Sequence, residues 1–416
     1  MKFKLTSLEK KWVLYDVGNS AFTMMVSTIF PIYFNALAEG AGISDVDYLA
    51  YWGYATSVCT LIVAILGPTL GAIADTKNFK KIVFSISMGI GVFGCILLGF
   101  LSSWIWFLGV FVLAKTGYSA SLIFYDAMLT DVTEPERMDS VSSHGYAWGY
   151  IGSCIPFIAC LGIVLGAGSL GIGTQTSMIL AFVITAFWWL CSSIPLLRSY
   201  RQKYFSDADG HVVRNSFKRL GRTFIDLTKE KHIFIFLLAF FFYIDGVYTV
   251  IDMATAYGQA LGLDSTGLLL ALLVTQIVAF PCVLIFSRLV KKIKPEAIIT
   301  ICIAAYFCIA VYAYWLDTQF DFWLLAVLVG MFQGTIQALS RSYFAKIIPA
   351  EKSGEFFGIY DICGKGASVI GTALVSVLSQ MTGSINIGVS ALSVMFLIGL
   401  VLFRYSAKLN AGRQTQ

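Results

Sequence analysis

Long apolar stretches, separated by short polar loops, follow one another along the whole chain of 416 residues. Each stretch has about 20 residues or more, which is the length that a helix needs to cross the hydrocarbon core of a bilayer. The pattern predicts an all-α membrane protein with twelve transmembrane helices. Their expected ranges, placed to within a few residues, are about 12–38, 48–74, 80–102, 104–130, 140–166, 176–197, 232–260, 265–288, 295–316, 320–346, 354–381 and 385–405.

The composition agrees with this pattern. Apolar residues make up 58% of the chain and charged residues only 13%, whereas an ordinary soluble protein is about 25% charged. The net charge of +5 does not indicate a nucleic-acid partner, because nearly all Lys and Arg lie in short loops beside the spans. The nine Cys fall inside spans without metal-ligand spacing, so we interpret them as small apolar fillers.

The basic residues lie on one side of the predicted bundle. They precede the first span, follow the even-numbered spans and end the chain, while the six loops on the other side contain no Lys or Arg. Cytoplasmic loops carry this excess in membrane proteins. We therefore expect a multi-pass protein of the cell membrane with both termini in the cytoplasm. Lys115 and Lys365 are the exceptions, since both fall deep inside spans.

A long central loop divides the chain into two sets of six spans. We expect an N-terminal bundle over residues 1–197, a cytoplasmic linker over 198–231 and a C-terminal bundle over 232–416. Within the linker, Phe217, Leu220, Phe224 and Leu227 recur at helical spacing among basic residues, which predicts an amphipathic helix on the membrane surface. A connector that spaces the two bundles is the simpler reading, and a regulatory role is the alternative.

The two halves resemble each other. FYDAMLTDVTEPERMDS, from residue 124, aligns without a gap with LSRSYFAKIIPAEKSGE, from residue 339. Two six-helix halves repeated in parallel around a midplane cavity are typical of a secondary transporter. The fold class that we predict is therefore two pseudo-symmetric six-helix bundles.

One loop carries a recognisable signature. GPTLGAIADTKNFKK (Gly67–Lys81) resembles the signature between spans 2 and 3 of the major facilitator superfamily. Gly71 and Asp75 match it, while Thr76 and Asn78 replace the usual basic residue and Gly. A Gly allows close approach of helices, and an Asp at a helix end can bond the N-terminus of a neighbouring helix. We expect Asp75 to brace one conformation of a gate.

Further segments narrow the resemblance. WVLYDVGNSAF (Trp12–Phe22), FYIDGVYTVIDMATAYG (Phe242–Gly258) and QALSRSYFAKIIP look like the vacuole-effluxer branch, which includes fungal autophagy-related amino-acid effluxers. The resemblance implies alternating access, an amino acid as solute and export as the direction. It also implies that spans 1, 4, 7 and 10 line the cavity.

Two lysines near the midplane are candidates for solute binding. Charges at this depth need a partner or a water-filled cavity. Lys115 and Lys365 could bind a carboxylate or phosphate of the solute, or each could form a structural ion pair between helices. Tyr118, Gln333 and Gln337 would supply neutral polar contacts.

Three carboxylates are candidates for proton coupling. Asp245 and Asp252 lie seven residues apart, on one face of span 7. Asp361 lies one turn before Lys365 and could neutralise it when no solute is bound. A carboxyl group in an apolar setting tends to be protonated, so these groups could carry a proton. The alternative for Asp245 is a hydrogen-bonded residue of helix packing.

The repeat predicts a gate. It places Asp126 at the position of Arg341 and Asp131 at the position of Lys346, with opposite charges in each pair. We expect the two pairs to meet across the pseudo-twofold axis and to close the cytoplasmic side. The alternative is that each residue pairs within its own half. Asp16, near the cytoplasmic interface, is expected to brace a helix or a gate.

These observations favour a secondary active transporter of a small polar, amino acid-like solute, with proton coupling. An organic anion, a peptide or a lipid-derived solute is the alternative within transport, and a receptor or scaffold is the alternative of another class. The chain has no GxxxxGK[ST] loop, no nucleophile triad and no metal-ligand cluster, so we expect no enzyme activity, cofactor or metal. The expected partners are the solute, protons and membrane lipid, without nucleic acid. We expect the protein to be a monomer.

Overall fold

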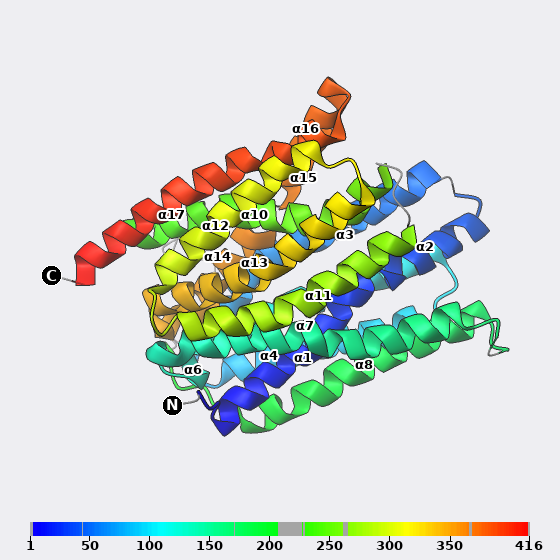
Figure 1. Cartoon of the computed structure of the whole chain (residues 1–416). Helices are drawn as coiled ribbons and strands as arrows, with labels where there is room; N and C mark the ends of the chain where they lie inside the picture. The colour runs from blue at the N-terminus through cyan, green and yellow to red at the C-terminus, as the bar shows by residue number, and fades with distance from the viewer. Residues whose placement is uncertain are drawn as a thin grey trace. The chain divides into compact units, whose positions relative to one another are not determined.

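The computed structural model describes residues 3–43, 45–169, 171–206, 227, 229–260, 265–365 and 368–414. The secondary structure of these ranges is helical, apart from one isolated bridge between Thr76 and Ser206 (Figure 1). The all-α class is confirmed. The longer helices are α1 (Ser7–Ser27), α2 (Ile29–Gly40), α3 (Asp45–Ala74), α4 (Phe79–Leu98), α5 (Trp104–Ala127), α7 (Pro135–Leu165), α8 (Thr174–Ser199), α10 (Lys231–Ala260), α11 (Ser265–Leu289), α12 (Pro295–Tyr312), α13 (Gln319–Ile347), α14 (Ser353–Lys365), α15 (Ser368–Thr382) and α17 (Leu392–Gln414).

The helices account for the expected spans. Within the described ranges, 11 helical segments are long and apolar enough to cross a membrane. Within the remaining expected span, 354–381, the structure describes α14 and α15, and α15 contributes the shorter apolar segment Ile370–Thr382. The protein is therefore a multi-pass membrane protein, and the arrangement is consistent with twelve spans.

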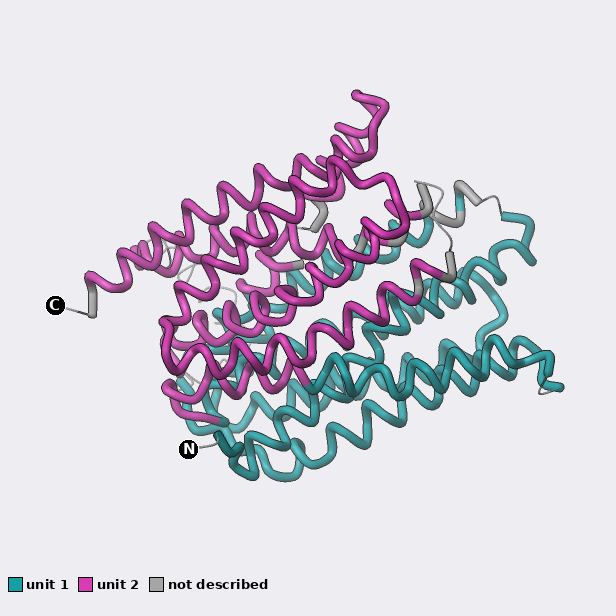
Figure 2. Tube along the Cα trace, viewed as in Figure 1, with its two compact units in different colours: residues 1–132, 148–212, 351–358 teal, residues 133–147, 213–350, 359–416 magenta. Residues whose placement is uncertain are grey.

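The chain forms two compact units (Figure 2). Unit 1 contains residues 1–132, 148–212 and 351–358, and unit 2 contains residues 133–147, 213–350 and 359–416. Each half of the sequence thus gives one short segment to the unit built mainly from the other half. The first residues of α7 belong to unit 2, and the first residues of α14 belong to unit 1.

Aromatic side chains fill the core of unit 1. The ring of Trp12 on α1 stacks on Tyr125 of α5 with centroids 4.4 Å apart, and its indole N–H donates to the backbone oxygen of Tyr125 at 3.0 Å. Trp12 is fully buried, so its N–H needs this acceptor. Farther along α1, Phe22 packs against Tyr118 and Trp189. These contacts fix α1 against α5 and α8.

Unit 2 has a similar aromatic core. Phe240 of α10 stacks on Tyr360 of α14 at 4.0 Å, and Tyr360 stacks on Phe344 of α13 at 4.8 Å. The buried hydroxyls of Tyr243 and Ser340 form a hydrogen bond of 2.6 Å between α10 and α13. The core therefore positions α10, α13 and α14 against one another.

The first span is broken at Thr28, between α1 and α2. Pro31 has no N–H to donate to the backbone oxygen of Ser27, four residues earlier. At the break itself, the Thr28 hydroxyl bonds the backbone oxygen of Met24 at 2.5 Å. The local sequence thus explains why this span is not one continuous helix.

The predicted amphipathic helix of the linker falls on Phe217–Leu227. Apart from Leu227, which is buried, these residues lie outside the part of the chain that the structure describes.

Candidate functional site

Asp75 binds the first turn of α14. Its carboxylate accepts the backbone N–H groups of Gly354 at 2.7 Å and Glu355 at 2.9 Å. The first N–H groups of a helix have no acceptor within the helix, and the positive end of the helix dipole favours a carboxylate there. From the sequence we expect Asp75 to contact the N-terminus of a neighbouring helix, and that helix is α14. Burial raises the pKa of the Asp75 carboxyl to about 7, against the lowering effect of Lys80 and the two N–H groups.

Glycines allow α3 and α14 to approach this closely. A Cβ added at Gly354 would lie 2.6 Å from the backbone oxygen of Gly71, and one added at Gly71 would meet the backbone oxygen of Gly354. One turn farther along, a Cβ at Gly358 would lie 2.6 Å from Cα of Pro68, next to Gly67. Both helices thus present glycines spaced by four, as in close helix pairs of membranes. The signature motif points to Gly71 in the sequence, whereas the contact with Gly354 and Gly358, at matching spacing, is evident only in the structure.

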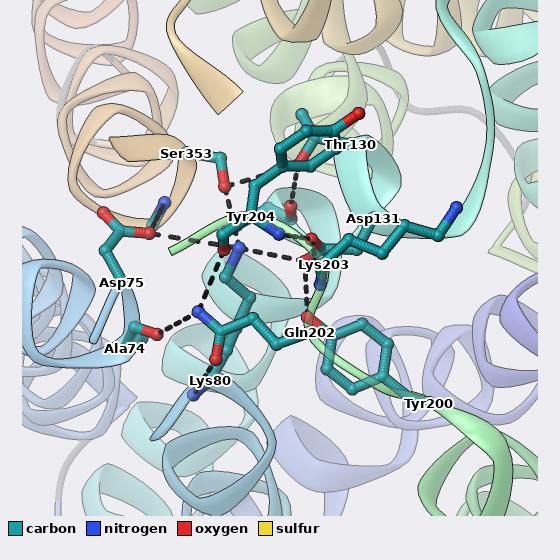
Figure 3. A network of polar contacts seen from close by, with 12 residues as sticks. Ala74, Asp75, Lys80, Thr130, Asp131, Tyr200, Gln202, Lys203, Tyr204 and Ser353 are labelled. Atoms are coloured by element: carbon teal, nitrogen blue, oxygen red, sulfur yellow. Dashed lines mark hydrogen bonds and ion pairs between the residues drawn. The ribbon is translucent and has the colours of Figure 1, made fainter. Parts of the chain in front are cut away.

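Lys80 lies at the centre of the same network (Figure 3). Its ammonium bonds Asp131 at 3.0 Å and the Ser353 hydroxyl at 2.8 Å, and it lies 3.9 Å from Asp75. The side chains of Lys80, Asp75 and Asp131 are fully buried. Buried charges persist only when they are paired. The basic cluster of the signature therefore supplies a cation for two buried carboxylates.

The predicted pairing of Asp131 with Lys346 stays a prediction, and each of the two residues has another described partner. Asp131 bonds Lys80, whereas the ammonium of Lys346 bonds both oxygens of Asp139 at 2.7 Å. The Ser342 hydroxyl also donates to Asp139, at 2.7 Å. Asp139 was not among the residues predicted from the sequence.

Arg341 is buried in unit 2. Its Nε donates to the hydroxyl of Ser142 at 2.9 Å and its Nη2 to the backbone oxygen of Ser142 at 3.1 Å. The guanidinium lies over the ring of Tyr146, 4.4 Å from the centroid. A planar guanidinium suits both contacts. Asp126 lies near the end of α5, and its pairing with Arg341 stays a prediction.

Asp16 is buried on α1 and accepts the side-chain amide of Asn19 at 3.3 Å. A Cβ at Gly149 would lie 3.3 Å from the backbone oxygen of Asp16, so α7 passes close by. These contacts are those of a residue in helix packing, and a role in gating stays a prediction.

In unit 1, α5 carries two of the predicted solute contacts. The ammonium of Lys115 lies over the ring of Phe111, 5.7 Å from its centroid, and both residues are on α5. One turn away, the hydroxyls of Tyr118 and Thr23 form a hydrogen bond of 2.5 Å. Lys115 and Tyr118 are partly exposed, and Thr23 is exposed. This patch combines a cation, an aromatic ring and two hydroxyls.

In unit 2, α13 carries the two predicted glutamines. The amide nitrogen of Gln337 donates to the backbone oxygen of Gln333 at 3.1 Å. Gln333 is buried, and its own amide nitrogen has no hydrogen-bond partner among the described residues. A buried donor without a partner is costly and suits a polar ligand.

Asp245 lies in the middle of α10 and is fully buried. Its Oδ1 accepts the backbone N–H of Gly371 at 3.2 Å and the hydroxyl of Thr249 at 3.3 Å. Its Oδ2 has no hydrogen-bond partner among the described residues. Because Gly371 lies on α15, Asp245 joins α10 to α15. A Cβ at Gly371 would meet the Thr249 hydroxyl and lie 2.7 Å from Oδ1.

For three further predicted residues the structure gives the helix and few or no side-chain contacts. Asp252 lies on α10 and Lys365 on α14, but both side chains lie outside the described part of the structure. Asp361 is partly exposed on α14, four residues before Lys365.

Comparison with known proteins identifies the family. Residues 7–136 and 130–416 match the family described as vacuole effluxer Atg22 like. The uncharacterized MFS-type transporter YxiO of Bacillus subtilis (strain 168) is 42% identical over 410 residues, which cover 97% of this chain and 96% of YxiO. The chain belongs to the Atg22-like family of major facilitator superfamily (MFS) transporters. Autophagy-related protein 22 of Coccidioides immitis (strain RS) is a more distant member, 22% identical over 85% of this chain and 72% of its own length.

Solved structures show the same fold. The human organic anion transporter MFSD10 (TETRAN) superposes with a TM-score of 0.73 at 13% identity, over 95% of this chain and 99% of its own. The MFS transporter FucP in the outward conformation gives 0.67 at 13% identity, over 96% of this chain and 97% of its own. At this identity the likeness shows the fold alone. It is membership of the Atg22-like family of MFS transporters that makes this chain a transporter and not an enzyme.

Proposed function

We propose that this Atg22-like transporter moves a small polar, amino acid-like solute by alternating access and couples this movement to protons. It works as a monomer in the cell membrane, with both termini in the cytoplasm. The observation that carries proton coupling is the buried carboxyl group of Asp245, with one oxygen unpartnered among the described residues.

The contacts of Asp245 suit a group that gains and loses a proton. Two donors, from Gly371 and Thr249, approach the same oxygen, Oδ1. A proton would therefore reside on Oδ2. The described partners of this carboxyl group include no cation, and an unpaired charge at this depth is costly. Loss of the proton thus changes the bond between α10 and α15, which is a direct route from protonation to helix movement.

The solute class follows from the residues in the spans. The cation of Lys115 would bind the carboxylate of a solute, and the Tyr118 and Thr23 hydroxyls would bind its polar groups. In unit 2, the amide of Gln333, which has no hydrogen-bond partner among the described residues, and that of Gln337 would bind polar groups of a solute. Lys365 and Asp361 complete the proposed set, with Asp252 as a further proton carrier.

The gate is proposed at the segments that the two halves exchange. Residues 351–358 are held by Asp75 and Lys80 in unit 1, and residues 133–147 are held by Arg341 and Lys346 in unit 2. Each set of contacts joins parts of the chain from both halves of the sequence. When the halves move during alternating access, these contacts must break and form again. Asp131, Asp126 and Asp16 belong to the same proposed gate.

Transport in vesicles tests the proposal. Purified protein with a pH-sensitive dye inside the vesicle is offered a panel of amino acids and their N-acetylated forms. The amino acid should produce a proton flux, and Asp245→Asn should remove the flux while exchange of labelled solute continues. Asp317→Asn, at an exposed loop position, is the matched control and should behave as the unchanged protein.

Two results would contradict parts of the proposal. Equal proton flux in Asp245→Asn would exclude Asp245 as the carrier. An organic anion is the second candidate solute, because Lys115 alone would bind its carboxylate. Transport of the N-acetylated forms as well as of the free amino acids would favour that candidate.

A further inference from the structure

A short segment without helical structure, residues 200–206, follows α8 and is fixed to unit 1; we name it the strap. The side-chain amide of Gln202 donates to the backbone oxygen of Ala74 at 3.1 Å. The backbone N–H of Ser206 donates to the backbone oxygen of Asp75 at 2.9 Å. The strap therefore lies along the turn that joins α3 to α4.

The strap also supplies most of the donors to Asp131. The Tyr200 hydroxyl donates to Oδ2 at 2.5 Å, and the backbone N–H groups of Lys203 and Tyr204 donate to Oδ1 at 3.0 and 2.9 Å. Lys80 adds the remaining described donor, at 3.0 Å. Because Asp131 is fully buried, its charge depends on these bonds. Release of the strap would leave the carboxylate with Lys80 alone.

Lys80 connects the strap with α14. An ammonium group has three protons to donate, and that of Lys80 is shared between Asp131, Asp75 and the hydroxyl of Ser353. Figure 3 shows these groups converging on one point. If Asp131 loses the strap, Lys80 must turn toward it and away from Ser353. The strap and the first turn of α14 thus depend on the same cation.

Tyr200 is suited to this position as a neutral donor. Burial and the adjacent Asp131 carboxylate raise its pKa well above the ordinary value, so the phenol keeps its proton. Phe at this position would preserve the packing of the ring and remove the bond. Tyr204 offers a matched comparison, since its side chain is 37% exposed and its hydroxyl makes no hydrogen bond among the described residues.

We propose that the strap is a positioning element of the gate: by holding Asp131 it fixes Lys80, and through Lys80 it stabilises the docking of residues 353–355 in unit 1. Tyr200 is its principal side chain. The beginning of the linker is then part of the transport machinery, beyond its part as a connector between two bundles. The proposal builds on the alternating-access function above, but its test needs no solute.

Hydrogen–deuterium exchange of the full-length protein measures the docking directly. The N–H groups of Gly354 and Glu355 bond Asp75, so their exchange reports how often the first turn of α14 leaves it. Tyr200→Phe should speed this exchange at least about tenfold, as loss of a hydrogen bond to a charged group implies. Tyr204→Phe should leave the exchange unchanged, and the melting temperature of both variants should remain close to that of the unchanged protein.

Coupling between two sites acts in both directions. Ser353→Ala removes a bond of Lys80 at α14 and leaves the strap untouched in sequence. It should speed exchange of the N–H groups of Lys203 and Tyr204, which bond Asp131. A segment that merely covers the α3–α4 turn would not respond to this change.

The outcomes are separable. Unchanged exchange at Gly354 and Glu355 in Tyr200→Phe would overturn the proposal, whether or not the vesicles transport a solute. If Tyr200→Phe does not fold, Gln202→Leu takes its place by the same criterion, because it removes the bond of the strap to Ala74. Faster exchange in Tyr204→Phe equal to that in Tyr200→Phe would also overturn it, since the bond to Asp131 would then not be the cause.

Discussion

The carboxylate of Asp75 and the backbone N–H of Gly354 form a hydrogen bond of 2.7 Å, although 279 residues separate them in the sequence. The bond requires the backbones of α3 and α14 to come close, because the donor is a main-chain group. Glycines at positions 71 and 354 make this approach possible. The contact therefore needs both the carboxylate of Asp75 and the absence of a side chain at Gly71 and Gly354.

A methyl group between these helices should break the docking. In Gly71→Ala the new Cβ meets the backbone oxygen of Gly354, which cannot turn aside as a side chain could. Overpacking of this kind costs about 1–3 kcal/mol. We expect exchange of the N–H groups of residues 353–355 to become about ten to a hundred times faster, and solute transport to fall.

The control lies on the same helix. Gly53→Ala also places a methyl group on α3, but among the described residues its Cβ meets no atom within 4 Å beyond its own stretch of helix. It should leave exchange and transport unchanged. Equal effects of the two substitutions would show that the cause is the helix itself and not its contact with α14.

The docking of α14 should depend on pH through Asp75. Its pKa is about 7 when buried, against an ordinary value of 3.8, so the docked state binds a proton more tightly than an exposed Asp75. Docking is therefore favoured fully below about pH 4 and loses this contribution as the pH rises through about 7. Exchange at residues 353–355, corrected for the intrinsic rate, should speed up across this range.

Asp75→Asn removes the titrating group and should flatten this pH dependence. Lys80, Asp131 and Glu355 remain in the variant. If the corrected exchange of Asp75→Asn still changes between pH 4 and 7 as before, one of these groups is responsible and the assignment to Asp75 is wrong.

The ion pair of Lys346 with Asp139 should stabilise unit 2. Lys346→Met leaves the nearly buried Asp139 with the Ser342 hydroxyl as its other described donor. The loss should be about 1–3 kcal/mol, less than for a fully buried pair because the Lys346 side chain is 23% exposed. Denaturation in detergent measures it.

Charge reversal distinguishes this pair from the one that the repeat predicts. Asp139→Lys with Lys346→Asp should recover at least half of the lost stability. Asp131→Lys with Lys346→Asp should recover none, because Asp131 bonds Lys80 and the strap. Recovery in the second pair alone would restore the repeat-based pairing.

The fold could be predicted from the sequence because the lengths and positions of the apolar segments show where the chain crosses the membrane. Span length, the one-sided basic loops and the glycine–aspartate signature led to twelve helices and to the superfamily. The sequence also drew attention to Asp75 and Asp245, since a charge near or inside a span must have a partner. All of these features depend on single residues and their neighbours in the sequence.

The residues that bond each buried charge could not be predicted in the same way. The repeat indicated Lys346 for Asp131, but the alignment carried no information on Lys80, 51 residues away, or on Tyr200, 69 residues away. The strap gave no sequence signal, because two of its three described bonds to Asp131 use backbone N–H groups, which nearly every residue has. Gly354 and Gly358 did have one, since their spacing repeats that of Gly67 and Gly71 on the helix they contact.

A methyl group at Gly371 should disturb the site of Asp245. The Cβ of Gly371→Ala would meet the Thr249 hydroxyl and lie 2.7 Å from Oδ1 of Asp245. We expect a loss of about 1–3 kcal/mol in stability and loss of proton-coupled transport, because the N–H of residue 371 can no longer reach Oδ1. Gly89→Ala is the control and should change neither, because its Cβ would meet no described atom within 4 Å beyond its own stretch of helix. Adding Thr249→Ala removes the first atom in the way, so the double variant should regain at least half of the lost stability in a detergent melt. If the double variant is no more stable than Gly371→Ala alone, the crowding at Thr249 is not the cause, and the close packing of α10 with α15 does not depend on this glycine.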